Sequence, residues 1–176
     1  MVIRKDIKPK FALISVFDKV DLKKLCISLK KHSYKFISTG STCKKIKSLG
    51  FDCIEISKIT KFKEMLEGRV KTLNPKIFGS ILYKRDNEKH IKEFENLKVP
   101  SISLVIVNLY PFKKYSKDKD KDKIIEMIDI GGPSLIRAAA KNFKFITTIC
   151  NTKYYYQLIN NLNKNKGDTD ISFRKS

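Results

Sequence analysis

Residues 102–109 read ISLVIVNL, and this run decides the fold class of the chain. It is short, rich in β-branched residues and apolar at most successive positions, a combination that favours a strand over a helix. Apolar side chains on both faces of one strand are typical of a parallel sheet that helices cover on both sides. We therefore predict a buried central strand over residues 102–109.

Shorter apolar runs elsewhere in the chain predict the other strands. Residues 11–16 (FALISV) and 34–38 (YKFIS) each have the length and composition of a buried strand. Weaker runs predict further strands over residues 53–56, 77–82 and 145–149.

Apolar residues at helical spacing separate these strands. One helix face is marked at positions i, i+3, i+4 and i+7 by Leu22, Leu25, Cys26 and Leu29. Asp18 is the candidate N-cap of that helix. Similar patterns predict a helix from the turn at 39–42 to Gly50, a short helix over 63–66 within a long loop (58–75), a helix through Ile91, Phe94 and Leu97, helices over 123–128 and 134–141, and a last helix face at Tyr155, Leu158, Ile159 and Leu162.

Strand and helix alternate with short connections, which predicts an α/β fold with a single doubly wound, mostly parallel sheet flanked by helices. The 176 residues suffice for one domain with a sizeable core. We expect an N-terminal extension over residues 1–10, the domain over 11–162, and a polar, weakly structured tail over 163–176. The charge run KKYSKDKDKDK at 113–123 is expected to be a solvated excursion.

Composition excludes several classes of protein. No stretch approaches the roughly 20 apolar residues of a membrane span, and no signal peptide is recognisable, so we expect a cytoplasmic protein with no membrane partner. No CxxC pair occurs and neither His32 nor His90 lies near a cysteine, so no metal site is expected. The four cysteines are predicted to be buried, reduced thiols: Cys26, Cys43, Cys53 and Cys150.

The net charge of +20 raises the question of nucleic acid. Lysines occur in every segment, however, without a basic stripe and without interleaved aromatic residues. We interpret the charge as a solvated basic surface that binds nucleic acid only non-specifically. The same surface attracts a phosphorylated small molecule.

Three segments combine turn-forming residues with ionisable or hydroxyl groups. The first is STGST at 38–42, where Gly40 permits close backbone approach. The hydroxyls of this turn and the N–H groups of the following helix suit a phosphate group. The plainer interpretation is a helix cap.

The second segment is GRVKTLNP at 68–75, in which Arg69 and Lys71 lie two residues apart. In an extended loop both side chains point the same way. Together with the Thr72 hydroxyl they suit an anionic or carbonyl-bearing ligand. The alternative is a pair of solvated charges in a lysine-rich protein.

The third segment is IDIGGPSLIRAAAKN at 128–142. Asp129 precedes a Gly-Gly-Pro turn, and a proline suits the first turn of a helix. Arg137 and Lys141 then lie one turn apart on one helix face. Alone, this segment also fits a capped surface helix.

Five stretches together resemble a known family: SVFDK, STGST, FKEMLEGRVKTLNPKI, VNLYPF and IDIGGPSLIRAAAKN. In this order and spacing they are similar to the N-terminal domain of the bifunctional purine-biosynthesis proteins, which join inosine monophosphate (IMP) cyclohydrolase to aminoimidazole-carboxamide ribonucleotide (AICAR) formyltransferase. The resemblance covers residues 11–162. It implies a methylglyoxal-synthase-like fold and the ring closure of formyl-AICAR to IMP, with no metal or organic cofactor.

The resemblance also implies residue roles. Lys141 resembles the family's proton-transfer lysine and Asp129 its partner carboxylate. Lys71 is expected to steady the developing oxyanion, and Tyr110 resembles the active-site tyrosine. The matching substrate contacts are Ser15, Asp18, Lys19, Thr39, Gly40, Ser41, Thr42, Arg69, Val70, Thr72, Val107, Asn108, Ile130 and Gly131, with the 5′-phosphate expected on the TGST turn and Lys19.

Several positions depart from the family pattern. Phe17 and Val20 replace hydroxyl residues beside the expected phosphate, and Ser41 replaces a glycine. Histidines are usual at the positions occupied here by Asn74 and Phe143, and another is usual near Phe78. These changes bear on substrate affinity more than on mechanism. We expect no formyl transfer from these 176 residues, and a homodimer and a separate formyltransferase chain remain open as partners.

Three alternatives were weighed against the cyclohydrolase. A methylglyoxal synthase needs an active-site histidine, whereas His32 and His90 both fall on predicted helices. A non-catalytic nucleotide sensor, like the regulatory domain of large carbamoyl-phosphate synthetases, does not need Lys71, Tyr110 and Asp129 together with Lys141. A degraded nucleotide-binding remnant of the same domain is favoured by the substitutions.

Overall fold

The computed structural model describes residues 10–112 and 120–176. In this part of the chain, five parallel strands form one sheet in the order β3-β2-β1-β4-β5. The strands are β1 (Lys10–Val16), β2 (Tyr34–Ser38), β3 (Cys53–Glu55), β4 (Ile102–Asn108) and β5 (Thr147–Ile149). The strands predicted from the runs at 11–16, 34–38 and 102–109 are therefore confirmed. The strands predicted over 53–56 and 145–149 are also present, as β3 and β5, but both are shorter than predicted.

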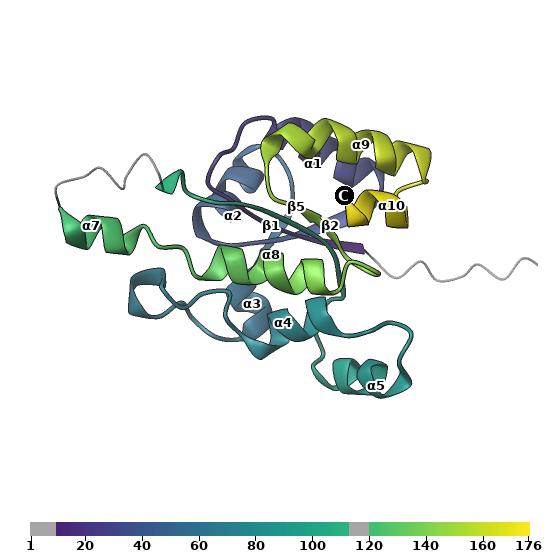
Figure 1. The fold of residues 1–176 in the computed structure, drawn as a ribbon, viewed down its shortest axis with the longest axis horizontal. Helices are drawn as coiled ribbons and strands as arrows, with labels where there is room; N and C mark the ends of the chain where they lie inside the picture. Colours follow the sequence, from purple (N-terminus) through teal and green to yellow (C-terminus); the bar gives the residue numbers. More distant parts are fainter. Residues whose placement is uncertain (1–9, 113–119) are drawn as a thin grey trace, which may run out of the picture.

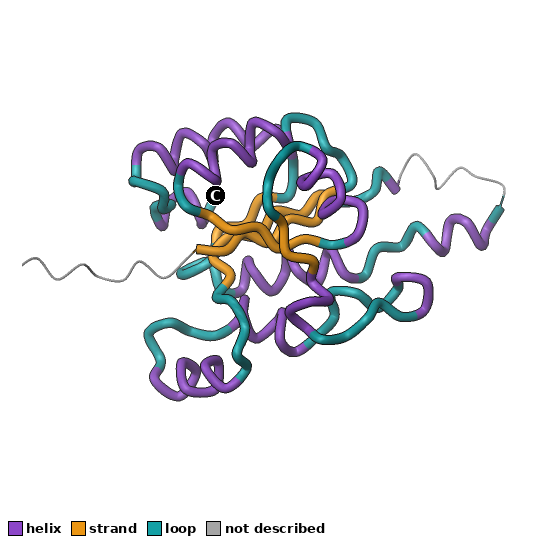
Figure 2. Tube along the Cα trace, turned by 180° about the vertical axis from the view of Figure 1, so that it is seen from behind, coloured by secondary structure: helices purple, strands orange, loops and turns teal. Residues whose placement is uncertain are grey.

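Helices cover both faces of the sheet, as predicted (Figures 1 and 2). Along β1, Ala12 and Ile14 belong to a core shared with α1 (Leu22–Lys31), α2 (Gly40–Ser48) and α9 (Tyr155–Lys164). Leu13 faces the other way, into a core shared with α3 (Ile56–Thr60), α4 (Pro75–Leu82) and α8 (Gly131–Lys141). Strand residues buried on both faces explain why β1 and β4 read as continuous apolar runs.

The strand order reverses beside β1. The chain passes from β1 to β2 and β3 on one side, and β4 and β5 are added on the other side of β1. Ligands of such sheets bind outside the carboxyl ends of the strands at this reversal. The carboxyl ends of β1, β2 and β4 at Val16, Ser38 and Asn108 therefore mark where a site is expected.

The predicted helix faces are confirmed in α1 and α9. Leu22, Leu25, Cys26 and Leu29 are all at most 1% exposed, and Tyr155, Leu158 and Leu162 are buried on α9. The predicted N-cap was wrong. Asp18 lies before a left-handed turn at Asp21, and its carboxylate accepts from the Val20 N–H instead.

Two predictions between β3 and β4 were wrong. Residues 77–82 form most of α4 rather than a strand, because Asn74 caps the helix and Pro75 starts it. Ile77, Ser80 and Ile81 lie at helical spacing on its buried face. The short helix predicted at 63–66 is replaced by α3 before it and by a 3₁₀ turn, η1 (Leu66–Gly68), after it.

The remaining elements are α5 (Glu88–Asn96), α7 (Lys121–Glu126), η2 (Thr152–Tyr154) and α10 (Ile171–Lys175). The tail is ordered, contrary to prediction, because Asp170 caps α10 and the buried Thr169 bonds the hydroxyl of Thr147 on β5. Of the predicted charge-run excursion, residues 113–119 lie outside the described residues, as do residues 1–9 of the predicted extension.

Three of the four cysteines are buried as predicted, and burial raises the pKa of the Cys26 thiol to about 12. Cys150 is exposed, so the prediction was wrong there. The described residues include no helix that is long and apolar enough to cross a membrane. Nor does this part of the chain hold a group of three His, Cys, Asp or Glu side chains suited to a metal ion.

Candidate active site

A cavity of about 530 Å³ opens at the carboxyl edge of the sheet. Its lining comes from four stretches that are far apart in sequence: the end of β1, the start of α2, residues 67–72, and the segment around the start of α8. Tyr110, just after β4, completes the wall. The cavity therefore lies where the strand order reverses, as the fold rule for parallel sheets requires.

The start of α2 forms one side of the cavity. Thr39 is the N-cap residue, but its hydroxyl bonds the Ser15 hydroxyl at 3.2 Å instead of capping the helix. Thr42 Oγ1 accepts from the Val16 N–H and donates to the Val16 carbonyl, so this hydroxyl ties α2 to β1. The N–H groups of a first helical turn have no partners within the helix, which leaves this end suited to an anion.

Lys71 lies opposite this helix end. Its Nζ is 2.7 Å from a carboxylate oxygen of Glu64. The same Nζ is so near Gly40 and Gly68 that a Cβ on either would lie about 3.5 Å from it. The lysine is therefore held between the α2 turn and its own loop, with 30% of its side chain exposed.

Glu64 was not among the residues singled out from the sequence. It lies within the quoted stretch FKEMLEGRVKTLNPKI, and a backbone bridge between Met65 and Val70 brings it beside Lys71. The available signal was that two carboxylates, Glu64 and Glu67, stand among four cations in this stretch. Its contact with Lys71 depends on a turn in which Leu66 and Glu67 both adopt positive φ, which no sequence pattern indicated.

Arg69 leaves the loop toward a different carboxylate. Its guanidinium pairs with Glu126 of α7 through both Nε and Nη2. Arg69 and Lys71 line the same cavity, as their spacing predicted, but each is paired with an acidic residue. Both pairs are partly exposed, so an anionic ligand can compete for either cation.

The start of α8 forms the opposite wall. Asp129 Oδ1 accepts a hydrogen bond from the Gly132 N–H at 2.8 Å. A Cβ on Gly132 would lie 2.6 Å from Asp129 Oδ2, and a Cβ on Gly131 would lie 2.7 Å from the Thr72 hydroxyl. The two glycines are therefore needed because a carboxylate and a hydroxyl approach the backbone here.

Tyr110 forms the remaining wall and is 44% exposed. Its ring packs against the ring of Phe17, with the centroids 4.9 Å apart. Phe17 is one of the departures from the family pattern noted in the sequence. In this chain it supports the cavity tyrosine from the side.

Comparison with known proteins places this geometry in a family. The family model described as "MGS-like domain" matches residues 21–134. This chain belongs to the MGS-like domain family. The predicted methylglyoxal-synthase-like fold is thereby confirmed.

Individual relatives give a more specific match than the family model does. The bifunctional purine biosynthesis protein PurH of Clostridium botulinum (strain Loch Maree / Type A3) is 48% identical over 167 residues, which cover 94% of this chain and 33% of that protein. PurH of Clostridioides difficile (strain 630) is 49% identical over 154 residues, covering 87% and 30%. The predicted resemblance to the bifunctional purine-biosynthesis proteins is confirmed, and this MGS-like domain spans about a third of their length.

A solved structure is also similar. The protein in "Crystal structure of ForH" superposes with a TM-score of 0.82 at 26% identity, over 94% of this chain and 86% of that one. The arrangement of the MGS-like domain therefore has a close experimental counterpart.

Lys141 lies apart from the other three predicted catalytic residues of this MGS-like domain. Lys71, Tyr110 and Asp129 line the cavity, whereas Lys141 is exposed at the last position of α8. The helix rises about 1.5 Å per residue, which puts its two ends roughly 15 Å apart. The two cations Arg137 and Lys141, four residues apart on one helix face, thus lie toward the helix end remote from the cavity.

The predicted substrate contacts divide in the same way. Those that line the cavity are Ser15, Thr39, Arg69, Thr72, Ile130 and Gly131. Asp18 and Asn108 instead bond each other across the ends of β1 and β4, at 2.9 and 2.8 Å. Lys19, Gly40, Ser41, Thr42, Val70 and Val107 do not line it; the Lys19 Nζ bonds the Phe17 carbonyl and Val107 is 1% exposed.

Proposed function

We propose that this MGS-like domain is an IMP cyclohydrolase, which closes formyl-AICAR to IMP in purine biosynthesis. The observation that carries the proposal is the convergence of Lys71, Tyr110 and Asp129 on one cavity at the carboxyl edge of the sheet. These residues come from three separate stretches of sequence, and those stretches match the cyclohydrolase motifs. The purine-biosynthesis relatives support the same activity.

The reaction makes one carbon–nitrogen bond and releases water. The carboxamide nitrogen loses a proton and attacks the formyl carbon, while the formyl C=O electron pair moves to oxygen, which becomes a hydroxyl. The C–O bond then breaks, and the hydroxyl leaves as water with the proton of the former formamide nitrogen. A C=N double bond completes the ring. The chemistry needs a base, a donor for the oxyanion, and a folded substrate.

Lys71 is the proposed oxyanion donor. Its ammonium is held beside Glu64 at 2.7 Å and faces the start of α2. A cation fixed where negative charge develops lowers the barrier because it needs no reorganisation during the reaction. Glu64 orients the lysine, which makes it a positioning residue.

Asp129 is the proposed proton acceptor. One carboxylate oxygen is occupied by the Gly132 N–H, and the other has no hydrogen bond within the described residues. This second oxygen is available to the carboxamide N–H. The family role of Lys141 in proton transfer remains a proposal for this chain, but the position of Lys141 at the other end of α8 favours Asp129 as the group that touches the substrate.

The substrate phosphate is proposed to bind at the start of α2. The N–H groups of the first helical turn and the hydroxyls of Thr39 and Ser15, which line the cavity, supply donors there. Arg69 offers a second anchor once the substrate displaces Glu126 from it. No resident cofactor or metal is part of this proposal.

A non-catalytic nucleotide-binding remnant is the second candidate. One observation favours it: Glu126 already neutralises Arg69 inside the cavity. Such a protein would bind IMP without accelerating ring closure.

The two candidates are separated by one assay. Purified protein is mixed with formyl-AICAR, and formation of the purine ring is followed by ultraviolet absorbance, with IMP binding measured in parallel by calorimetry. The cyclohydrolase requires a rate above that of the buffer blank. IMP binding at the blank rate would establish the remnant and reject the enzyme.

A further inference from the structure

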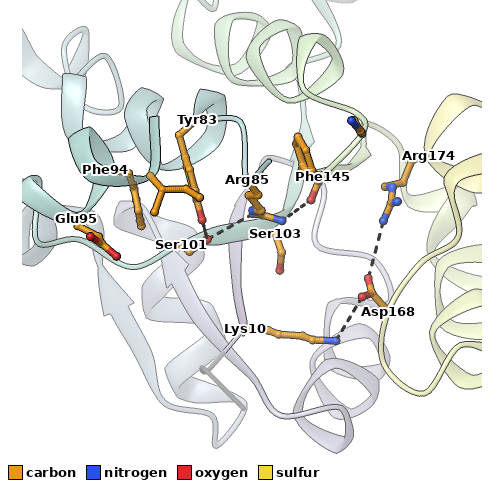
Figure 3. Close-up of a pocket in the computed structure, with 12 residues that line it drawn as sticks. Lys10, Tyr83, Arg85, Phe94, Glu95, Ser101, Ser103, Phe145, Asp168 and Arg174 are labelled. Atoms are coloured by element: carbon orange, nitrogen blue, oxygen red, sulfur yellow. Dashed lines mark hydrogen bonds and ion pairs between the residues drawn. The ribbon is translucent and has the colours of Figure 1, made fainter. Parts of the chain in front are cut away.

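A second cavity, of about 560 Å³, opens at the amino edge of the sheet (Figure 3). It lies between the starts of β1 and β4, the residues just before β5, and the C-terminal segment. The seven residues of β4, rising about 3.3 Å each, place it roughly 20 Å from the carboxyl-edge cavity. The proposed cyclohydrolase reaction makes no use of it.

The charge of this cavity is unbalanced. Its lining includes four cations, Lys10, Arg85, Lys144 and Arg174, but only two carboxylates, Glu95 and Asp168. Lys144 is also paired with Asp86, which lies just outside the lining. An excess of one positive charge remains, so the cavity favours an anionic ligand over a neutral one or a cation.

Arg85 is the cation that contributes most directly to this excess of positive charge. Its guanidinium donates to the carbonyls of Phe145 and Ile102, each at 2.6 Å. Within the described residues it has no carboxylate partner, and its Nε is buried without a hydrogen-bond acceptor. The backbone therefore fixes this arginine in place without neutralising it.

The C-terminal segment adds a second, weakly paired arginine. Arg174 and Lys10 share the carboxylate of Asp168, each at 3.9 Å, which is long for an ion pair. The Arg174 side chain is only 16% exposed, and its Nε also lacks an acceptor within the described residues. Figure 3 shows Arg174, Asp168 and Lys10 on one side of the cavity and Arg85 beside Phe145.

Aromatic rings form another part of the wall. Tyr83 and Phe94 stack with centroids 4.0 Å apart and planes 5° from parallel. The Arg85 guanidinium lies 5.5 Å from the Tyr83 ring and 6.0 Å from the Phe145 ring. A cationic patch thus borders a planar apolar surface.

We propose that this amino-edge cavity binds a small organic anion in which a phosphate or carboxylate is attached to a flat ring. The oxyanion would contact Arg85 and Arg174, which offer charged donors. The ring would lie against Tyr83 and Phe94, where aromatic contact adds to the affinity. The site is independent of the carboxyl-edge cavity and of the reaction proposed there.

Amide NMR titration tests the proposal, because it reports each edge of the sheet separately. The probes are phenyl phosphate, benzoate, inorganic phosphate and phenol. We expect phenyl phosphate or benzoate to shift the amides of Ser101, Ser103 and Phe145 in a saturable way, at concentrations several-fold below those needed for inorganic phosphate or phenol. The better of the two aromatic anions identifies the preferred oxyanion. Shifts confined to residues 39–42 and 131–132, or no saturation at this edge, would overturn the proposal.

Three variants distinguish the effect of a charge inside the cavity on ligand affinity from the effect of a charge outside it. Losing a charge-assisted hydrogen bond weakens binding by roughly tenfold, so Arg85→Gln should raise the dissociation constant by about that factor. Lys144→Ala removes an exposed lining cation and leaves its partner Asp86 uncompensated beside the cavity, so it should raise the dissociation constant a few-fold. Lys84→Ala removes the same charge next to Arg85 but outside the lining, and should change nothing.

Arg85 also bonds two backbone carbonyls, so its variant requires a folding check by circular dichroism. If Arg85→Gln does not fold, the comparison of Lys144→Ala with Lys84→Ala decides the matter. Equal effects of those two variants would overturn the proposal.

Discussion

The two edges of the sheet hold their cations in different ways. At the carboxyl edge, Lys71 and Arg69 are each paired with a carboxylate, Glu64 and Glu126, and two helices begin at the cavity. At the amino edge, Lys10, Lys144 and Arg174 also pair with carboxylates, but Arg85 is held by backbone carbonyls instead. The first arrangement offers charges with exchangeable partners beside the N-termini of two helices, which suits a reaction in which charge moves. The second offers a fixed charge, which suits retention of an anion.

The largest expected effect concerns the two ends of α8. Asp129→Asn should lower the rate of formyl-AICAR cyclisation by about 10²–10⁴-fold, the usual contribution of a general base. Lys141→Ala should have a smaller effect, because Lys141 lies at the end of the helix remote from the cavity. Initial rates of IMP formation measure both. A loss for Lys141→Ala that equals or exceeds the loss for Asp129→Asn would contradict this assignment.

The next effect concerns the close packing at the carboxyl edge. A Cβ on Gly132 would lie 2.6 Å from both Asp129 Oδ2 and Leu109 Cδ2. Gly132→Ala should therefore lower the free energy of unfolding by roughly 1–3 kcal/mol, as overpacking does, and displace the Asp129 carboxylate. Urea denaturation measures the first change and the cyclisation rate the second.

Ser134→Ala, in the same turn of α8, is the control. It removes one hydrogen bond to the Ile130 carbonyl without crowding. Equal stability and activity for the two variants would show that the glycine is not required by packing.

The smallest effect concerns the tail beside the amino edge. Hydrogen bonds from the Ser172 hydroxyl, the Phe173 N–H and Asn161 hold the pKa of Asp170 well below its usual range. A depressed carboxyl pKa contributes stability above the unfolded-state value, near 3.9, and that contribution is lost as pH falls through the folded-state value. Asp170→Asn should therefore be less stable than the parent at pH 7, with the difference shrinking below about pH 4.

Urea denaturation midpoints of Asp170→Asn and the parent, measured between pH 3 and pH 7, check this pH dependence of stability. Asp52→Asn, at an exposed position after α2, is the matched control and should leave the profile unchanged. A difference between Asp170→Asn and the parent that stays constant across this range would reject the linkage.

The sequence predicted the central strands of the sheet well but led to a strand being predicted where one helix lies. The runs at 11–16, 34–38 and 102–109 are buried on both faces, so their apolar composition identifies them as strands. The run at 77–82 has the same composition, but Asn74 and Pro75 start a helix there. In a run of six residues the apolar pattern alone cannot separate the two, and the cap decides.

The site was predictable in part for a similar reason. Lys71, Tyr110 and Asp129 follow from motif resemblance, and the cavity brings them together. The other contributors are residues that contact the site from elsewhere in the sequence: Glu64 contacts Lys71, Glu126 contacts Arg69 and Phe17 contacts Tyr110. The members of these pairs lie 7 to 93 positions apart in the sequence. Such partners depend on tertiary packing, which one sequence does not reveal. Lys141 is the opposite case. Motif resemblance groups it with Asp129, although the length of α8 keeps it away from the cavity.

The cyclisation rate of Lys71→Ala tests the central claim most directly. Purified parent, Lys71→Ala and the exposed control Lys58→Ala are each mixed with formyl-AICAR, and purine formation is followed by absorbance. If the carboxyl-edge cavity is a cyclohydrolase site, the parent and Lys58→Ala react well above the blank, and Lys71→Ala loses about 10²–10³ in rate, as expected for an oxyanion donor. A parent rate equal to the blank, or a Lys71→Ala rate equal to the parent's, would contradict the claim.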